Sequence, residues 1–200
     1  MRIDTLILEN FFDEKEIDYI TAECSAMDTD QYDDPVQVHN GTYYAVPSSV
    51  ESLIDQKIPK LPNEILHVKF FDSTEPAGLH ADTNGDTATY YDSLARTIII
   101  PLDTYDCKTV VFHQELKCGE NNNHIINFPI LSDENDNVPD FFLHLLPHRD
   151  SLKRLSIETM FDWSKGSLLA FDRKRLHCST VFSDNMTCKK GLVIWTVIKN

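Results

Sequence analysis

From Ile65 to the C-terminus, the hydrophobic positions fall into short runs, each about as long as one β-strand. The runs are rich in branched and aromatic residues, and clusters of turn-forming residues separate them. The runs are ILHVKFF, RTIIIPL, TVVFH, SLLAF and GLVIWTVI. Helical patterns do not alternate with these runs, which disfavours a parallel α/β sheet. The pattern therefore predicts a mainly β fold, an antiparallel sandwich or jelly roll.

The N-terminal region follows a different pattern, typical of a helix. Asp13 can cap a helix whose third residue is Glu16, which is the spacing of a capping box. Ile17, Ile20 and Cys24 then recur at helical spacing, so one face of this helix should be buried.

Two polar segments are expected to be loops. Residues 27–40 are polar and acidic, and residues 118–156 are polar, rich in asparagine and punctuated by prolines around one apolar stretch, VPDFFLHLLPH. Loops as long as the second usually serve as functional lids or are disordered. We expect one domain over residues 1–200, with an N-terminal support region at 1–63 and a β core at 64–200 that carries the 118–156 insert.

Composition and charge narrow the class of protein. Of the 200 residues, 42% are hydrophobic and 25% are charged, as in an ordinary globular protein. The net charge of −14 disfavours binding to nucleic acid, because the phosphate backbone would repel the chain. The one basic cluster, at residues 173–175, is interpreted as a solvated turn.

Several features bear on location. No apolar run approaches the length of a membrane span, and the N-terminus lacks the cleavage site of a signal peptide. The five cysteines cannot all pair within one chain and form no CxxC motif, so we expect a reducing, cytoplasmic setting. A zinc site could use four residues, although their spacing is wider than structural zinc sites usually show. These are Cys107, His113, Cys118 and His124.

The segment GLHADTNGD carries the strongest chemical signal. On a strand, His80 and Asp82 would point to the same face, because residues i and i+2 share a face. His177, in LLAFDRKRLHCST, follows a predicted strand and turn, where a jelly roll could return it to the first pair. Two histidines and one carboxylate that leave open positions are the ligand set of non-heme Fe(II) oxygenases.

A second signal lies in CKKGLVIWT, where two lysines enter an apolar strand. A buried ammonium is costly unless it is paired, and a dicarboxylic ligand would supply that pair. Lys189 shares a face with Gly191, which would leave room for a ligand close to the backbone. We therefore prefer Lys189 as the anion partner and keep Lys190 as the alternative. A solvated turn before the strand would place both lysines in water.

These segments together resemble the 2-oxoglutarate- and Fe(II)-dependent oxygenase superfamily, in particular its prolyl-hydroxylase-like and phage-type branches. The resemblance rests on HAD at 80–82, RLHCS around His177 and KKGL at 189–192, and it covers residues 64–199. It implies a double-stranded β-helix (jelly roll) core with a supporting N-terminal helix or helices. The basic residue follows His177 at a greater distance than is usual in the family, because the SDNMT turn is long.

The resemblance also implies a function. Fe(II) would bind His80, Asp82 and His177, and 2-oxoglutarate would chelate the iron and pair its far carboxylate with Lys189 or Lys190. With dioxygen, such an enzyme hydroxylates a C–H bond of a peptide or small-molecule substrate and releases succinate. A cupin-like metal-binding jelly roll and a non-catalytic binding module that retains the triad are the alternatives. The sequence carries no signal for an oligomeric state.

Other residues fit this site less well than the triad and the two lysines. Arg96 is expected to form an ion pair at a strand end rather than to reach the cosubstrate. Tyr43 and Tyr44 could line a substrate groove or pack in the core. Asp86 fits the carboxylate position less well than Asp82. Four histidines, His67, His113, His144 and His148, are expected at the surface or in the core rather than on a metal.

Overall fold

The computed structural model describes residues 4–26, 36–38, 41–82, 95–116, 152, 155–183 and 185–198. The helices in this part are α1 (Glu14–Ser25) and α2 (Ser48–Lys57). The strands are β1 (Leu6–Leu8), β2 (Val36–Val38), β3 (Gly41–Ala45), β4 (Glu64–Ser73), β5 (Arg96–Pro101), β6 (Lys108–Glu115), β7 (Ile157–Asp162), β8 (Leu168–Asp172), β9 (Arg175–Ser179) and β10 (Lys189–Ile198). Neither helix has the length and apolar character needed to cross a membrane.

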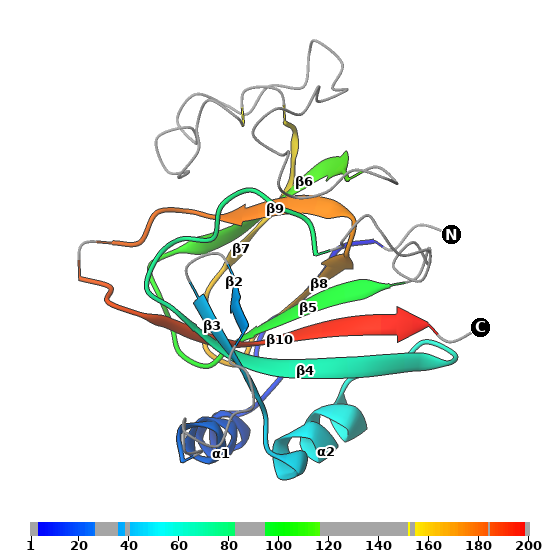
Figure 1. Cartoon of the computed structure of the whole chain (residues 1–200), viewed down its shortest axis with the longest axis vertical. Helices are drawn as coiled ribbons and strands as arrows, with labels where there is room; N and C mark the ends of the chain where they lie inside the picture. The colour runs from blue at the N-terminus through cyan, green and yellow to red at the C-terminus, as the bar shows by residue number, and fades with distance from the viewer. Residues whose placement is uncertain are drawn as a thin grey trace.

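The strands form two antiparallel sheets (Figure 1). The larger sheet has seven strands in the order β1-β8-β5-β10-β4-β3-β2, and the smaller has three in the order β7-β6-β9. Side chains from both sheets share one buried cluster, in which Phe171 and Val193 of the larger sheet join Val111 and Phe161 of the smaller one. The mainly β, jelly-roll architecture expected from the sequence is confirmed.

The alternation of side chains gives each central strand of the larger sheet two buried faces. In β8, Leu168 and Ala170 pack in the same cluster as the helices, whereas Leu169 and Phe171 pack in the cluster between the sheets. Burial on both faces explains why β5, β8 and β10 appear in the sequence as nearly continuous apolar runs.

The two helices cover the outer face of the larger sheet, beside β4 and β10 (Figure 1). The predicted capping box of α1 is present: the Asp13 side chain accepts from the Glu16 backbone N–H at 2.9 Å, and the Glu16 side chain accepts from the Asp13 N–H at 2.8 Å. The predicted buried face of α1 is confirmed by Ile17, Ile20 and Cys24. Helix α2, which the sequence pattern did not predict as an element, buries Val50 and Ile54 on the same sheet.

The N-terminal region also contributes strands. β1 pairs with β8, and β3 joins β4 to β2. The prediction of a loop over 27–40 is wrong for Val36–Val38, which form β2, and the other residues of that segment lie outside the described part. β1, β2 and β7 lie at sheet edges, where a strand has one neighbour and needs no long apolar run. Most of the 118–156 insert also lies outside the described residues.

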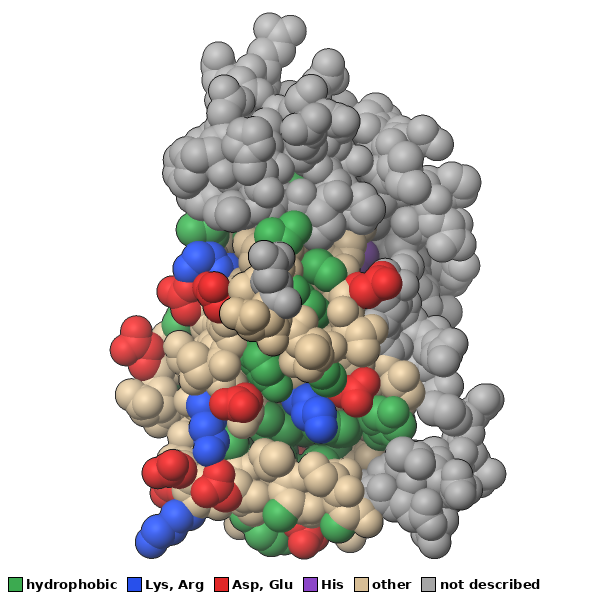
Figure 2. Space-filling model, turned by 90° about the vertical axis from the view of Figure 1, so that its left-hand side faces the viewer, with side chains coloured by type: hydrophobic (Ala, Val, Ile, Leu, Met, Phe, Trp, Pro, Cys, Tyr) green, Lys and Arg blue, Asp and Glu red, His purple; other side chains and the backbone are tan. Residues whose placement is uncertain are grey.

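Figure 2 shows one face of the molecule, on which acidic and basic side chains lie scattered among hydrophobic and uncharged ones. The described residues of this face form no continuous basic patch.

Candidate metal centre

Three side chains that can each offer one metal ligand converge at one point. The candidate ligand atoms of His80, Asp82 and His177 all lie within 4.8 Å of one another. Nε2 of His80 lies 3.7 Å from Oδ1 of Asp82, and Nε2 of His177 lies 3.6 Å from Oδ2 of the same carboxylate. The structure thus brings together the three residues that the sequence singles out, and they are the one such group found among the described residues.

The backbone holds the two histidines side by side. His177 lies in the middle of β9, and His80 forms an isolated antiparallel bridge with it. The sequence predicts that His80 and Asp82 share a strand, but in the structure neither residue belongs to one. His80 is held instead by its bridge to His177, the second candidate histidine.

Hydrogen bonds also orient both imidazole rings. Nδ1 of His80 lies 2.7 Å from the carbonyl oxygen of Gly78, and Nδ1 of His177 lies 3.1 Å from that of Arg175. Because a carbonyl only accepts, each Nδ1 carries the proton and donates it. In the tautomer with the proton on Nδ1, Nε2 is the nitrogen left to bind a metal. In both rings Nε2 faces Asp82, which is how metal-ligating histidines are usually oriented.

The charges of these groups suit a divalent cation. Burial, with the neighbouring His177, lowers the pKa of His80 to about 4, so this ring is neutral at neutral pH. Burial raises the pKa of Asp82, but the two imidazoles and the hydrogen bond from Thr97 outweigh it and hold that pKa below its ordinary value. A neutral imidazole and an ionised carboxylate are the forms that bind metal.

A threonine fixes the Asp82 carboxylate from the side of the larger sheet. The Oγ1 hydroxyl of Thr97, on β5, donates to Oδ2 of Asp82 at 2.6 Å, and Thr97 is fully buried. No motif in the sequence marks Thr97 as a supporting residue. The one available signal is a hydroxyl side chain within the apolar run RTIIIPL.

Lys189 lies deep between the sheets at the start of β10, with only 3% of its surface exposed. Its ammonium donates to Oγ of Ser179 at 2.8 Å and stands 4.2 Å from the centre of the Trp163 ring. No carboxylate of the described residues pairs with it. Burial lowers its pKa to about 8, which expresses the cost of holding this charge without an anionic partner.

Lys190 is placed differently. It is half-buried, and its backbone N–H donates to the Tyr105 hydroxyl at 3.0 Å. The space that Gly191 was expected to leave for a ligand is already filled. A Cβ at that position would lie 3.0 Å from the Phe71 ring and 3.1 Å from the carbonyl oxygen of Ile100. Gly191 therefore serves close packing of the strands.

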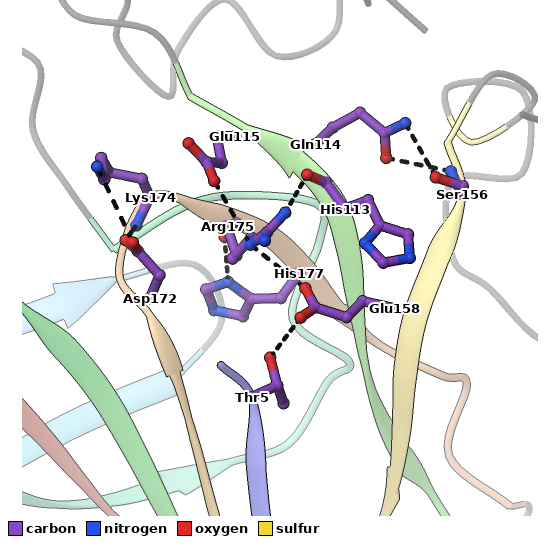
Figure 3. A network of polar contacts seen from close by, with 10 residues as sticks. All are labelled: Thr5, His113, Gln114, Glu115, Ser156, Glu158, Asp172, Lys174, Arg175 and His177. Atoms are coloured by element: carbon purple, nitrogen blue, oxygen red, sulfur yellow. Dashed lines mark hydrogen bonds and ion pairs between the residues drawn. The ribbon is translucent and has the colours of Figure 1, made fainter. Parts of the chain in front are cut away.

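The interpretation of residues 173–175 as a solvated turn is wrong for both arginines. Arg173 is 6% exposed and Arg175 is 1% exposed. Figure 3 shows the Arg175 guanidinium between Glu115 and Glu158, and its Nε lies 3.3 Å from Oε2 of Glu158. The charges are buried because carboxylates and main-chain carbonyls surround the guanidinium groups, which sequence proximity could not reveal.

The remaining candidates are placed as follows. Arg96 forms the expected strand-end ion pair, with Nη2 2.6 Å from Oε2 of Glu64. Tyr43 packs between the sheets, with its ring centre 5.6 Å from that of Trp195, while Tyr44 stacks 5.8 Å from Phe70 on the helix side. Burial and the nearby Asp82 charge raise the pKa of Tyr43.

Some candidates lie outside the described residues. These are Asp86, Cys118, His124, His144 and His148. The zinc alternative therefore stays a prediction, with Cys107 in it a buried free thiol.

Comparison with known proteins adds to this geometry. No protein-family model and no curated protein sequence matches the chain. Solved structures do match over almost its whole length. The non-heme α-ketoglutarate-dependent carbocyclase SnoK from nogalamycin biosynthesis aligns with a TM-score of 0.61 at 10% identity, over 97% of this chain and 80% of that one.

Two further structures align similarly. HygX from Streptomyces hygroscopicus, with nickel and 2-oxoglutarate bound, has a TM-score of 0.58 at 14% identity, over 98% of this chain and 83% of its own. A prolyl-4-hydroxylase from Pseudomonas putida has a TM-score of 0.54 at 10% identity, over 98% and 93%. The resemblance seen in the sequence is thus confirmed at the level of the fold, which this chain shares with non-heme 2-oxoglutarate- and Fe(II)-dependent oxygenases.

Proposed function

We propose that this protein is an Fe(II)- and 2-oxoglutarate-dependent dioxygenase that hydroxylates a C–H bond of a small-molecule or peptide substrate. One observation carries the proposal: a two-histidine, one-carboxylate group lies in the same inter-sheet space as a buried lysine that lacks a carboxylate partner among the described residues. A shared fold supports it but would not be enough alone, because one fold hosts many functions.

The side chains of the triad fit Fe(II). His80 and His177 would each offer Nε2, and Asp82 would offer one carboxylate oxygen while Thr97 keeps hold of Oδ2. Two neutral imidazoles and one carboxylate would leave a net charge of about +1 at the centre and coordination positions for further ligands. Bound Fe(II), with dioxygen and 2-oxoglutarate, supplies the oxidising chemistry and yields succinate and carbon dioxide.

Lys189 would bind the far carboxylate of 2-oxoglutarate. Its ammonium and the Ser179 hydroxyl already contact each other, so both could donate to one carboxylate. The rings of Trp163 and Phe182 lie beside the ammonium and would keep water from the ion pair. In such a dry setting a charge-assisted hydrogen bond is stronger than in water. Lys190 stays the alternative, but it is half-buried, whereas Lys189 is buried between the sheets, so Lys190 suits this role less well.

The proposed substrate class rests on the ligands and activities of the structural neighbours. HygX has been crystallised with hygromycin B and the epimerase SnoN with nogalamycin RO, both small molecules, whereas another neighbour is a prolyl-4-hydroxylase. SnoK is a carbocyclase and SnoN is an epimerase. Succinate release alone therefore does not demonstrate hydroxylation, and the products have to be identified as well.

The test is succinate release. Purified protein supplied with Fe(II), 2-oxoglutarate and oxygen is screened against small molecules and prolyl peptides, and products are examined for added oxygen by mass spectrometry. We expect succinate to form with at least one substrate and to disappear in His80→Ala and Asp82→Ala. Wild-type rates in either variant would contradict the proposal.

Calorimetry distinguishes the alternatives. A cupin-like protein would bind Mn(II) but not 2-oxoglutarate, and a relic module would show no metal-dependent thermal shift. An oxygenase binds 2-oxoglutarate in the presence of Mn(II).

A further inference from the structure

The described residues that lead from β4 to Asp82 form no helix or strand that would hold this carboxylate in place. β4 ends at Ser73, the bridge of His80 to β9 is isolated, and Asp82 belongs to no strand. A metal-binding carboxylate must nevertheless stay within about half an ångström of its working position. Some other contact has to fix the backbone of this residue.

Arg173 provides that contact. It lies in the turn between β8 and β9, and its guanidinium donates to the main-chain carbonyl of Asp82 twice, from Nε at 3.1 Å and from Nη2 at 2.6 Å. Nη1 of the same group donates to the carbonyl of Thr196 on β10 at 3.1 Å. In return, the backbone N–H of Asp82 donates to the carbonyl of Arg173 at 3.1 Å. Each of the two residues thus donates hydrogen bonds to the main-chain carbonyl of the other.

The residue type suits this task. A planar guanidinium presents several N–H donors in a fixed fork, so it can bond to two carbonyls at once, and a lysine ammonium cannot reproduce that geometry. Arg173 is 6% exposed, so its bonds form away from competing water. Thr97 fixes the Asp82 side chain, and Arg173 fixes its backbone.

We propose that Arg173 is a positioning residue for the metal centre, which sets metal affinity by tying the backbone of Asp82 to β10. The inference rests on the proposed function, since it requires that the triad bind a metal. When a group that hydrogen-bonds to a metal-ligating residue is removed, metal affinity typically falls by about 10- to 100-fold.

The experiment compares metal binding with folding stability. Wild type, Arg173→Lys and Arg173→Gln are titrated with Ni(II) by calorimetry, and the unfolding of each metal-free protein is measured in urea. The matched control is Arg96→Lys, which disturbs another guanidinium that bonds to a main-chain carbonyl and to Glu64, but not to Asp82. We expect Ni(II) affinity to fall about 10- to 100-fold in both Arg173 variants and to stay unchanged in the control.

A double-mutant cycle separates positioning from general destabilisation. In an Asp82→Ala background, Arg173→Lys should cause no further loss of Ni(II) affinity, because the ligand that it positions is gone. Should both Arg173 variants prove unfolded, Arg173→Ala with added ethylguanidinium takes their place, and restored Ni(II) affinity is expected.

Four results would overturn the inference. The first three are wild-type Ni(II) affinity in folded Arg173 variants, an equal loss in Arg96→Lys, and a full further loss in the Asp82→Ala background. The fourth is a lack of rescue by ethylguanidinium in Arg173→Ala. A wild-type protein that binds no metal would refute the proposed function itself, which the Arg173 variants alone cannot do.

Discussion

His80 and His177, far apart in the sequence, are joined by two backbone hydrogen bonds: the N–H of His80 donates to the carbonyl of His177 at 3.0 Å, and the N–H of His177 donates back at 2.8 Å. Their ring centres consequently lie 4.2 Å apart. Two of the three candidate ligands are therefore fixed relative to each other by the fold, before any ion binds.

This arrangement makes a direct prediction about the ligands. Alanine at His80, Asp82 or His177 removes one of three donors, and Mn(II) affinity should fall by more than about 100-fold, beyond the loss seen when only a supporting group is changed. Calorimetric titration measures it. His67→Ala serves as control because His67 is exposed on β4, and a similar loss there would show that the effect is not specific to the triad.

The hydroxyl of Thr97 gives a second prediction. Thr97→Val keeps the shape but removes the donor to Asp82, so the folded protein should lose about 1–3 kcal/mol of stability and Mn(II) should bind about tenfold more weakly. Thr109→Val is the matched control. Its hydroxyl accepts from the Trp163 indole N–H at 2.8 Å, so it should lose stability with no change in Mn(II) affinity.

The parts of this molecule that sequence could predict are those with a local pattern. The inner strands show as apolar runs because both faces are buried, and the α1 capping box and buried face follow from spacing within one helix. The triad could be inferred because His80 and Asp82 are close in the chain and because His177 follows a predicted strand and turn that a jelly roll could return to them.

The rest depends on tertiary contacts that no local pattern encodes. Arg173 and Arg175 looked like a solvated turn, and they are buried because carbonyls from distant segments accept their hydrogen bonds. β1 and β2 are short edge strands whose pairing comes from their neighbours. Thr97 can donate to the Asp82 carboxylate only because the fold brings β5 next to Asp82.

The buried ammonium of Lys189 predicts two opposite effects of one substitution. Lys189→Met removes an uncompensated charge, so the ligand-free protein should become more stable by about 1–3 kcal/mol. The same change should weaken 2-oxoglutarate binding by about 30-fold or more, because the partner of its far carboxylate is lost. Urea unfolding and calorimetry measure the two effects. If Lys190→Met weakened binding more than Lys189→Met, the assignment of the anion partner would move to Lys190.

Lys189 should also make ligand binding depend on pH. Its pKa is lowered from 10.5 to about 8, so the ammonium that attracts a dicarboxylate is lost as the pH rises through about 8. Affinity for 2-oxoglutarate, measured anaerobically with Mn(II), should therefore fall above that pH. Lys189→Met should show no such fall, and an identical pH profile in that variant would contradict the prediction.

The same pKa shift has a consequence for stability. Between about pH 8 and pH 10.5 the unfolded chain holds the lysine proton that the folded protein has released, so this group makes the folded state relatively more stable as pH rises through that window. The difference in unfolding free energy between wild type and Lys189→Met isolates the effect. That difference should shrink with rising pH, and a constant difference would contradict it.

If the triad and Lys189 form one site for a metal and a dicarboxylate, binding of 2-oxoglutarate must depend on the metal. 2-Oxoglutarate is titrated calorimetrically into the wild-type protein under anaerobic conditions, with and without saturating Mn(II). One 2-oxoglutarate is expected to bind per chain with Mn(II) present, and none in its absence. Equal binding with and without Mn(II), or no binding in either case, would contradict it.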